Sequence, residues 1–334
     1  MTIKDLAAKT GYGVATVSRV LNNHPNVSEK ARQAILEAVR ESGFQINANA
    51  QQLKQLHSSS ILVVVKGTAN ELFAELVENI QACIAPAEYP LLVDYLDENA
   101  NEVLRAVQLC REKKPRGLLF LGGNRENFLA DFHKIDIPSV LITNDASGLP
   151  FENLSSVSTD DRAAARCAMD TLLGLGHRHI AVIGGDPSVS DTSRLRYEGC
   201  LAALAESGAE FDETRDYQAV RFSYADGYAA AQALLRTGRQ YTALFAASDV
   251  MAIGAIRALW DAGLRVPEDV SVIGFDGLPL GSYLVPQLST IAQPVPSIAE
   301  RSVALLIACI EEGVAARYET VPFTLCLRES TRPL

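Results

Sequence analysis

The most informative segment of this 334-residue chain is residues 14–22, Val14-Ala15-Thr16-Val17-Ser18-Arg19-Val20-Leu21-Asn22. Val17, Val20 and Leu21 recur at helical spacing and predict a buried helix face. The same spacing leaves Ala15, Thr16, Ser18 and Arg19 on the outer face. Residues 22–26 are rich in turn formers and end the helix. The segment therefore predicts a short amphipathic helix whose outer face carries one arginine.

Two further helices are predicted on either side of this segment. The first begins at residues 2–5, where Thr2 can cap the helix and Asp5 can reach back to the cap, and it ends before Gly11 and Gly13. The third follows the capping residue Ser28 and ends near Gly43. Its predicted buried positions are Ala31, Ile35, Ala38 and Val39. A helix, a tight turn, a helix and a bracing helix form the layout of a helix-turn-helix unit.

Residues 47–60 are predicted to be a linker. They are polar, and although their helix propensity is respectable, an isolated helix of this length is marginal in water. A segment of this kind can fold when it docks on a partner.

From Ile61 onward, short apolar runs alternate with longer amphipathic stretches such as 73–84. Apolar strands joined by helical crossovers form parallel sheets that are covered on both faces. There are more strands than one small lobe needs, so we expect an α/β core of two lobes, with a ligand site where the carboxyl ends of the strands converge. The predicted strands are 61–65, 91–95, 117–121, 139–143, 155–158, 179–184, 243–247 and 270–275.

The charge distribution favours a nucleic-acid partner for the N-terminal part only. Residues 1–57 hold seven Lys or Arg and four Asp or Glu, which gives +3 there and −13 on the rest of a chain whose net charge is −10. A basic head can meet DNA phosphates while the acidic body is repelled from them.

Composition and motifs exclude several classes of protein. No apolar run approaches the roughly 20 residues that cross a bilayer, and no secretion signal is present, so we expect a cytoplasmic, nucleoid-associated protein with no membrane partner. No GxGxxG after a strand, GxxxxGK[ST], GxSxG or HExxH motif occurs, so we predict no catalytic residue and no cofactor. An enzyme acting on a sugar or nucleotide and a secreted binding protein are the disfavoured alternatives. The cysteines are scattered along the sequence, which predicts reduced, mostly buried thiols and no metal site. They are Cys83, Cys110, Cys167, Cys200, Cys309 and Cys326.

The segments Thr2-Ile3-Lys4-Asp5-Leu6-Ala7 and 14–22 strongly resemble the start of the lactose-repressor (LacI/GalR) family of bacterial regulators. Essentially the whole chain is covered, because five core segments follow in the family's order and approximate spacing. They are Asn70-Glu71-Leu72-Phe73, Leu175-Gly176-His177-Arg178-His179-Ile180-Ala181, Arg196-Tyr197-Glu198-Gly199, Ser248-Asp249-Val250-Met251-Ala252-Ile253-Gly254 and Val270-Ser271-Val272-Ile273-Gly274-Phe275-Asp276.

The resemblance implies a headpiece at 1–46, a hinge helix and linker at 47–60 and an effector-binding and dimerisation core at 61–334. The core is expected to resemble periplasmic sugar-binding proteins. Its N-lobe should comprise about 61–158 and 292–320, and its C-lobe about 159–291 and 321–334. The family also implies a homodimer on a near-palindromic operator. We prefer a dimer to a tetramer, because no leucine-heptad tail follows the core.

In the headpiece, the resemblance implies direct contacts with operator DNA. Val14 and Ala15 occupy the positions by which this family largely selects its operator, and Arg19 can grip a guanine edge. Thr16 and Ser18 are expected to hold phosphates, which position the protein without specifying sequence. Gly13 departs from the family, which usually has a capping serine there. Further predicted contacts, of which Asn22 and Ser28 could serve only as caps or turn residues, are Thr2, Asn22, Asn26, Ser28 and Arg32.

In the linker, Leu53 occupies the position of a hinge leucine that wedges into the minor groove at the operator centre. Asn47, Ala50 and Gln51 are expected to line the same groove. A linker leucine that rests on the core is the alternative for Leu53.

In the core, Arg196 and Asp276 align with the family's effector-binding pair and offer a polyol planar donors and a carboxylate acceptor. The alternative is a purely structural ion pair. The remaining candidates include two phenylalanines that could instead be core residues and an asparagine that could instead stabilise a turn; they are Asn70, Phe73, Thr143, Phe222 and Ser248. Lys66 replaces a proline common in the family, and the sequence offers no explanation for it.

Together these observations predict a sequence-specific transcriptional regulator whose operator affinity is controlled by a small-molecule effector. A repressor is the preferred type of regulator. A saccharide is the first choice of effector. A purine or nucleoside is the second, because Phe73 and Phe222 could sandwich a flat base. The residues leave open whether the effector induces or corepresses.

Overall fold

The computed structural model describes residues 3–21, 27–42, 59–67, 70–87 and 89–334. The chain divides into two compact units, residues 1–58 and residues 59–334. None of the described helices is both long and apolar enough to cross a membrane.

The first unit contains the three predicted helices, α1 (Ile3–Thr10), α2 (Val14–Leu21) and α3 (Glu29–Ser42). Leu6, Val17 and Ile35, one from each helix, are fully buried against one another. The carbonyl of Gly13 accepts hydrogen bonds from the amides of Thr16 and Val17 and so begins α2. The predicted helix-turn-helix layout is confirmed.

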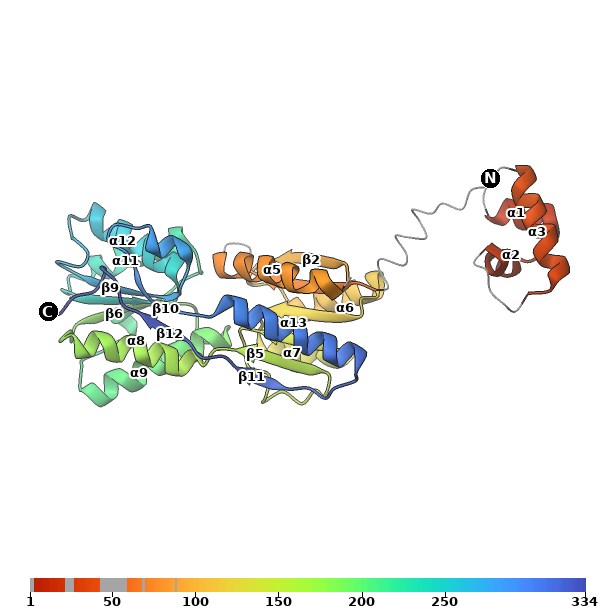
Figure 1. Cartoon of the computed structure of the whole chain (residues 1–334). Helices are drawn as coiled ribbons and strands as arrows, with labels where there is room; N and C mark the ends of the chain where they lie inside the picture. Colours follow the sequence, from red (N-terminus) through yellow and green to blue (C-terminus); the bar gives the residue numbers. More distant parts are fainter. Residues whose placement is uncertain (1–2, 22–26, 43–58, 68–69, 88) are drawn as a thin grey trace. The chain divides into compact units, whose positions relative to one another are not determined.

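The second unit consists of two α/β lobes joined by three chain crossings, at 159–160, 293–294 and 321–323 (Figure 1). The N-lobe holds the strands β1 (Ile61–Lys66), β2 (Leu91–Leu96), β3 (Gly117–Leu121), β4 (Ser139–Ile142), β5 (Leu154–Ser158) and β11 (Tyr318–Thr320). Its helices are α5 (Glu71–Ile84), α6 (Glu102–Lys113), α7 (Arg125–Asp131) and α13 (Val295–Glu311).

The C-lobe holds the strands β6 (Ile180–Gly184), β7 (Tyr217–Ala219), β8 (Ala243–Ala246), β9 (Ser271–Asp276), β10 (Ser289–Ala292) and β12 (Thr324–Cys326). Its helices are α8 (Asp161–Gly174), α9 (Asp191–Ser207), α10 (Glu213–Asp216), α11 (Tyr224–Arg236) and α12 (Asp249–Asp261).

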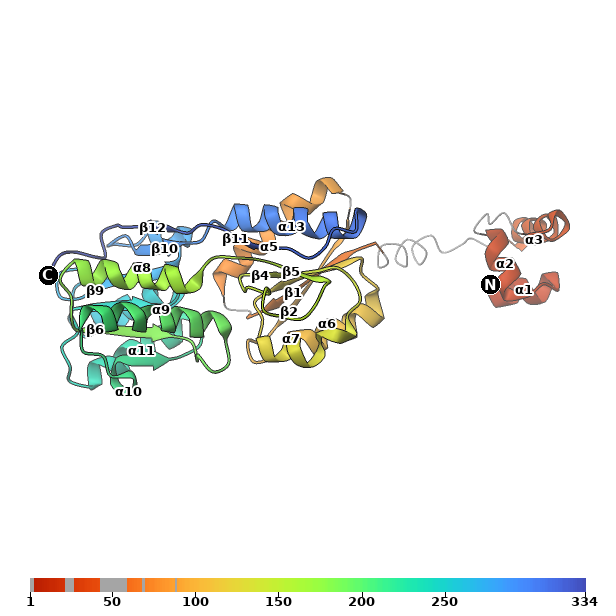
Figure 2. The ribbon, with the colours of Figure 1, turned by 90° about the horizontal axis from the view of Figure 1, so that it is seen from below.

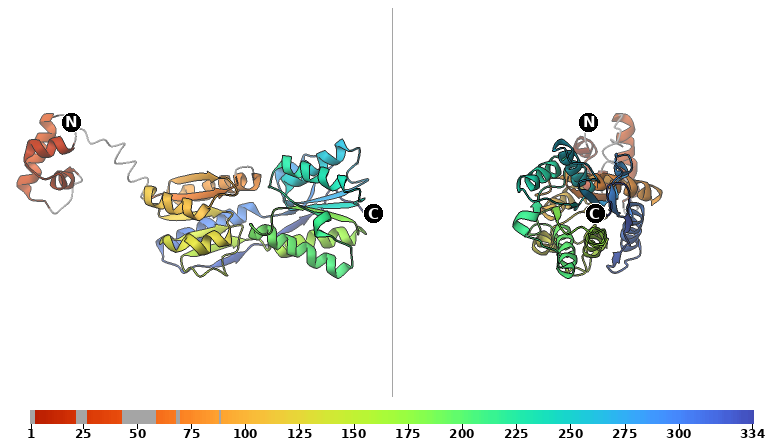
Figure 3. Two further views of the ribbon diagram at one scale, coloured as in Figure 1. Left: turned by 180° about the vertical axis from the view of Figure 1, so that it is seen from behind. Right: turned by 90° about the vertical axis from the view of Figure 1, so that its left-hand side faces the viewer.

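Helices cover both faces of each sheet, as the apolar strands predict. In the N-lobe, α5 and α13 pack on one face and α6 and α7 on the other (Figure 2). In the C-lobe, α8 and α9 lie on the opposite side of the sheet from α11 and α12, which is also visible from behind (Figure 3). The N-lobe sheet is wholly parallel. The C-lobe sheet differs from the prediction at its edge, where β12 pairs antiparallel with β10.

The two sheets share one topology. Their strand orders are β11-β5-β4-β3-β1-β2 and β12-β10-β9-β8-β6-β7, so the direction of winding reverses between β1 and β3 and between β6 and β8. In doubly wound sheets such a reversal opens a crevice at the carboxyl ends of the strands, where ligands bind. Each lobe therefore offers one crevice.

The cysteines correct one prediction. All six are free thiols, as expected, but only Cys200 is buried and the other five are half-buried. The described residues contain no group of His, Cys, Asp or Glu that could hold a metal ion.

Candidate functional site

The outer face of α2 presents the side chains that the sequence assigned to DNA. Val14 is 42% exposed, Ala15 and Arg19 are exposed, and Thr16 is half-buried. Val17 and Val20 on the opposite face anchor the helix in the headpiece core. This apolar anchoring fixes the orientation of α2, so that its first residues and Arg19 face outward.

Ser28 has the capping role that the sequence left open. Its Oγ accepts a hydrogen bond from the amide of Ala31, and its carbonyl accepts one from the amide of Arg32. Ser28 is exposed and Arg32 is half-buried. Seven predicted DNA contacts lie outside the described residues, as does the side chain of Ser18; the seven are Thr2, Asn22, Asn26, Asn47, Ala50, Gln51 and Leu53.

A cleft of about 850 Å³ lies between the two lobes, where the loops after their strands meet. This volume lies within the range of small-molecule sites, about 300–1,000 Å³. Six of the seven predicted effector contacts line it: Asn70, Phe73, Thr143, Arg196, Phe222 and Asp276.

Ser248 is the exception and corrects the prediction. It is fully buried, and its Oγ accepts a hydrogen bond from the amide of Met251, so it caps α12 instead of lining the cleft. A serine at a helix N-terminus bonds to the free amides of the first turn, which occupies its hydroxyl.

Arg196 is the most heavily engaged polar side chain of the cleft. Its Nε donates to Asp161 Oδ1 at 2.7 Å and its Nη1 donates to the carbonyl of Ala247 at 2.6 Å. Nη1 also lies 3.8 Å from Asp276 Oδ1, and the guanidinium stacks 3.7 Å from the centre of the Phe275 ring. No hydrogen bond joins Nη2 to any described residue, so this nitrogen is free to donate to a ligand.

Asp276 ends β9 in an unusual backbone conformation, with a φ of 115°. Its Oδ1 accepts a hydrogen bond from Gln293 Nε2 at 2.9 Å. Burial raises the pKa of this carboxyl to about 7, although nearby Arg196 lowers it. A non-glycine residue at positive φ costs free energy, and such strain clusters at functional sites.

A second buried carboxylate, Asp249, lies behind Asp276. It accepts hydrogen bonds from Thr290 Oγ1 at 2.6 Å and from the amide of Leu278 at 2.7 Å. Burial, followed by the charge of Asp276, raises the pKa of Asp249 to about 8. Asp249 thus holds the loop after β9, which directly follows Asp276.

Two phenylalanine rings line the cleft from opposite lobes, and glycines let them approach the backbone. A Cβ at Gly122 would lie 3.1 Å from the Phe73 ring, and one at Gly185 would lie 2.7 Å from the Phe222 ring. Gly122 follows β3 and Gly185 follows β6, so each ring lies at the crevice of its own lobe.

The two remaining predicted contacts also have structural roles. Asn70 caps α5 through a hydrogen bond from the amide of Leu72 to its Oδ1, which is the turn-stabilising alternative of the prediction. Thr143 has a φ of 73° and follows β4, and its Oγ1 lies 3.5 Å from Asn144 Oδ1. Both residues can still contact a ligand, because both line the cleft.

Side chains of the two lobes pair with one another at the cleft and beside it. Arg221 of the C-lobe pairs with Asp97 at 2.7 Å and with Glu98, which both follow β2 of the N-lobe. Tyr224 of α11 donates to Glu71 of α5. The lobes are thus in contact across the site.

Sequence reasoning missed three residues of this network. None of Asp161, Asp249 and Gln293 was predicted to contact a ligand. They nevertheless hold, in that order, Arg196, the loop after β9 and Asp276. Asp249 lies inside one of the quoted core segments and follows a strand, which is the signal that could have found it. The sequence does not indicate the roles of Asp161 and Gln293, because Asp161 lies 35 residues from Arg196 and Gln293 lies 17 residues from Asp276.

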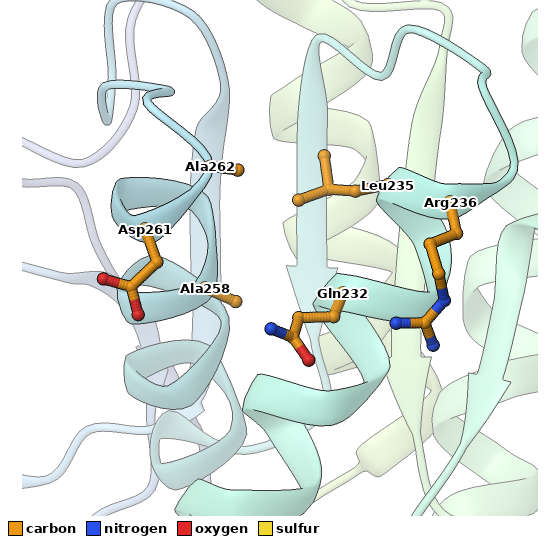
Figure 4. Close-up of a pocket in the computed structure, with 6 residues that line it drawn as sticks. All are labelled: Gln232, Leu235, Arg236, Ala258, Asp261 and Ala262. Atoms are coloured by element: carbon orange, nitrogen blue, oxygen red, sulfur yellow. The ribbon is translucent and has the colours of Figure 1, made fainter.

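A smaller hollow of about 230 Å³ lies between α11 and α12 (Figure 4). It is lined by Gln232, Leu235, Arg236, Ala258, Asp261 and Ala262. These residues belong to the last turns of α11 and α12 and not to the loops that follow the carboxyl ends of the strands, so the larger cleft is the candidate ligand site.

Comparison with known proteins agrees with this geometry. Residues 2–47 match the family described as bacterial regulatory proteins of the lacI family, and residues 169–331 match a periplasmic binding protein-like domain. The chain is 36% identical to the HTH-type transcriptional regulator MalR of Clostridium butyricum, with 99% of each chain covered. It is 32% identical to the ribose operon repressor of Halalkalibacterium halodurans, with 99% of this chain and 97% of that protein covered.

Two solved structures match over the full length as well. The lac repressor dimer bound to operator and an anti-inducer is 27% identical, with a TM-score of 0.74 and 99% of each chain covered. The complex of the transcriptional regulator CelR with cellobiose is 27% identical, with a TM-score of 0.70 and the same coverage. The headpiece, the two-lobed core and these full-length matches lead to one conclusion: this chain belongs to the LacI family of DNA-binding transcriptional regulators.

Proposed function

We propose that this regulator is a repressor that binds a near-palindromic operator as a homodimer and is controlled by an uncharged saccharide bound between its lobes. The observation that carries the proposal is the cleft, in which Arg196 and Asp276 offer donors and an acceptor between two phenylalanine rings. A saccharide presents hydroxyl groups that both donate and accept, together with apolar ring faces. Charge-assisted hydrogen bonds to such hydroxyls are strong and specific.

The charges of the cleft favour a neutral ligand. Each lysine or arginine among its described lining residues is paired with a carboxylate, in the pairs Lys66–Glu102, Arg196–Asp161 and Arg221–Asp97. A phosphorylated ligand would need a cation that is not already neutralised. The similar regulator CelR has been solved with cellobiose, which is a neutral saccharide.

A dimer is supported by the surface and by a structural relative. Tyr283 is 82% exposed and Val285 is 96% exposed, in the loop after β9. Exposed apolar side chains in one loop are typical of protein contacts. The lac repressor, which matches this chain over 99% of its length, was solved as a dimer on its operator. In a dimer, two copies of α2 can reach successive major grooves.

The effector is proposed to act by changing how the lobes are arranged, and thereby how the two headpieces meet DNA. A ligand shifts such an equilibrium only if it binds one arrangement more tightly than the other. An effector that induces and an effector that corepresses both satisfy this condition, and operator binding in its presence distinguishes them.

A purine or nucleoside is the second candidate effector. Phe73 and Phe222 line the cleft from opposite lobes, and two aromatic rings in such positions suit a flat base.

The test begins with a thermal-shift screen of the purified protein against neutral sugars, sugar phosphates, nucleosides and purines, because a ligand of the native state raises its melting temperature. A neutral sugar is the expected hit, and a hit among only the nucleosides would favour the second candidate. Selection from a random duplex pool should then yield a near-palindromic site, whose affinity is compared with and without the hit at fixed salt. An unchanged affinity would contradict control by that ligand.

A further inference from the structure

Lys66, which the sequence left unexplained, is the last residue of β1 and lies at the crevice of the N-lobe. The winding of the sheet reverses between β1 and β3, so the carboxyl ends of these two strands flank the position where ligands bind in such folds. Lys66 lines the cleft, and so do Gly122 and Asn124, which follow β3. A lysine therefore stands on the N-lobe wall, whereas Arg196 and Asp276 belong to the C-lobe.

A buried glutamate holds this lysine in place. Lys66 Nζ donates to Glu102 Oε2 at 2.6 Å, and the side chain of Glu102 has no exposed area. The same carboxylate accepts from the amide of Asn124 at 2.6 Å and from Asn127 Nδ2 at 2.9 Å. Glu102 thus joins the ends of β1 and β3 and the start of α7. We call Lys66, Glu102, Asn124 and Asn127 the Lys66 cluster.

The Lys66 cluster contains donors and an acceptor that make no hydrogen bond to a described residue. An ammonium group has three donors, and among the described residues only Glu102 accepts from Nζ. The side chain of Lys66 keeps 12% of its area exposed, and the structure places it and Asn127 in the cleft lining while Glu102 lies beneath. The amide oxygen of Asn127 makes no hydrogen bond to a described residue. The cluster can therefore donate to one ligand hydroxyl and accept from another.

We propose that Lys66 and Asn127, held by Glu102, form a hydroxyl-binding point on the N-lobe wall, in addition to the N-lobe contacts that the family pattern predicts. This inference rests on the proposed function and deepens it. Because Glu102 neutralises the ammonium group, the point selects uncharged hydroxyls over anionic groups.

The test uses the full chain and calorimetric titrations with maltose, cellobiose, glucose, ribose and glucose 6-phosphate. Lys66→Met alone leaves a buried carboxylate unpaired, which destabilises proteins strongly. The informative variant is therefore Lys66→Met with Glu102→Gln, which removes both charges and keeps an acceptor for the amide of Asn124. The matched control is Arg239→Met with Asp216→Asn, since Arg239 is 13% exposed, Asp216 is fully buried, and neither lines the cleft.

We expect both double variants to unfold near the wild-type temperature. The Lys66 double variant should bind the neutral sugar at least about tenfold more weakly, which corresponds to about 1.4 kcal/mol, while the control stays within about twofold. Unchanged affinity in the Lys66 double variant would overturn the inference and leave the proposed function standing. Binding of glucose 6-phosphate in preference to the neutral sugars would overturn the selectivity that we assign to Lys66. If the wild-type protein bound none of these sugars, both this inference and the proposed control by a neutral saccharide would be contradicted.

Discussion

Replacing Arg196 by methionine should destabilise the protein mainly through the carboxylates that the arginine leaves behind. Arg196 is hydrogen-bonded to Asp161 and ion-paired with Asp276, and the side chains of all three are at most 6% exposed. Removing one partner of a buried ion pair typically costs about 3–5 kcal/mol, because the other charge remains buried without compensation. The apolar stem of methionine keeps part of the packing on Phe275, so we expect a loss in this range at pH 8.

The loss of stability in Arg196→Met should be smaller at acidic pH. Burial raises the pKa of Asp161 and of Asp276, and Arg196 opposes this rise in both. Without the arginine, the pKa values of both carboxyls in the folded variant rise further. In the unfolded chain the same carboxyls lose their protons above their ordinary pKa of about 3.8, whereas the folded variant still holds them. The stability of the variant therefore falls as pH increases from about 4 through the raised values. At pH 5.5 the carboxyls can be neutral, and the difference from wild type shrinks.

Urea unfolding followed by circular dichroism at pH 5.5 and pH 8 measures both effects. Arg166→Met is the control, because Arg166 is 40% exposed and pairs with the exposed Glu206, and such surface pairs are worth about 0–1 kcal/mol. A loss below about 1 kcal/mol for Arg196→Met at pH 8, or an equal loss at both pH values, would refute the reasoning.

Three further predictions concern the ligand, the core and DNA. Burial raises the pKa of Asp276 to about 7, so calorimetry should show tighter sugar binding as pH rises from 6 to 8, and Asp276→Asn should flatten this profile. Gly254→Ala should lower the free energy of unfolding, measured in urea, by about 1–3 kcal/mol, because the new Cβ would lie 2.1 Å from the carbonyl oxygen of Tyr224. The control Gly174→Ala should leave the stability unchanged, because its Cβ would meet no atom within 4 Å. Arg19→Ala should weaken binding to the selected operator, measured by fluorescence anisotropy, by about 1–3 kcal/mol, and equal loss on non-specific DNA would contradict base reading.

The headpiece and the central strands could be predicted because burial imposes a period on the sequence. α2 ends at Leu21, within one residue of the prediction, since its buried valines recur at helical spacing. The strands β7, β10, β11 and β12 were missed. They are three or four residues long and contain too few apolar residues to form a run, so only their pairing with neighbouring strands identifies them.

The candidate site was predictable only where a ligand position was fixed by family pattern. Arg196 and Asp276 were found in this way and do line the cleft. Ser248 follows the same pattern but lies at a helix start, where its hydroxyl bonds to the amide of Met251. Lys66 remained unexplained because its partner Glu102 lies 36 residues away in the sequence, and only the fold brings the two together.

The two charged candidate ligand-binding residues of the C-lobe, Arg196 and Asp276, are bonded to residues that lie in or directly beside the segments that connect the lobes. Asp161, which accepts from Arg196, begins α8 directly after the first crossing at 159–160, and Gln293, which donates to Asp276, lies within the second crossing at 293–294. A hydroxyl that donates to Asp276 or accepts from Arg196 therefore joins the same hydrogen-bond network as Gln293 and Asp161. Because one of these bonds ends on a connecting segment and the other directly beside one, we expect occupancy of the cleft and the arrangement of the lobes to be coupled through direct contacts. A coupling of this kind requires no long chain of intermediate residues, and it acts in both directions, so any change that holds the crossings in one arrangement must also change the affinity for the effector.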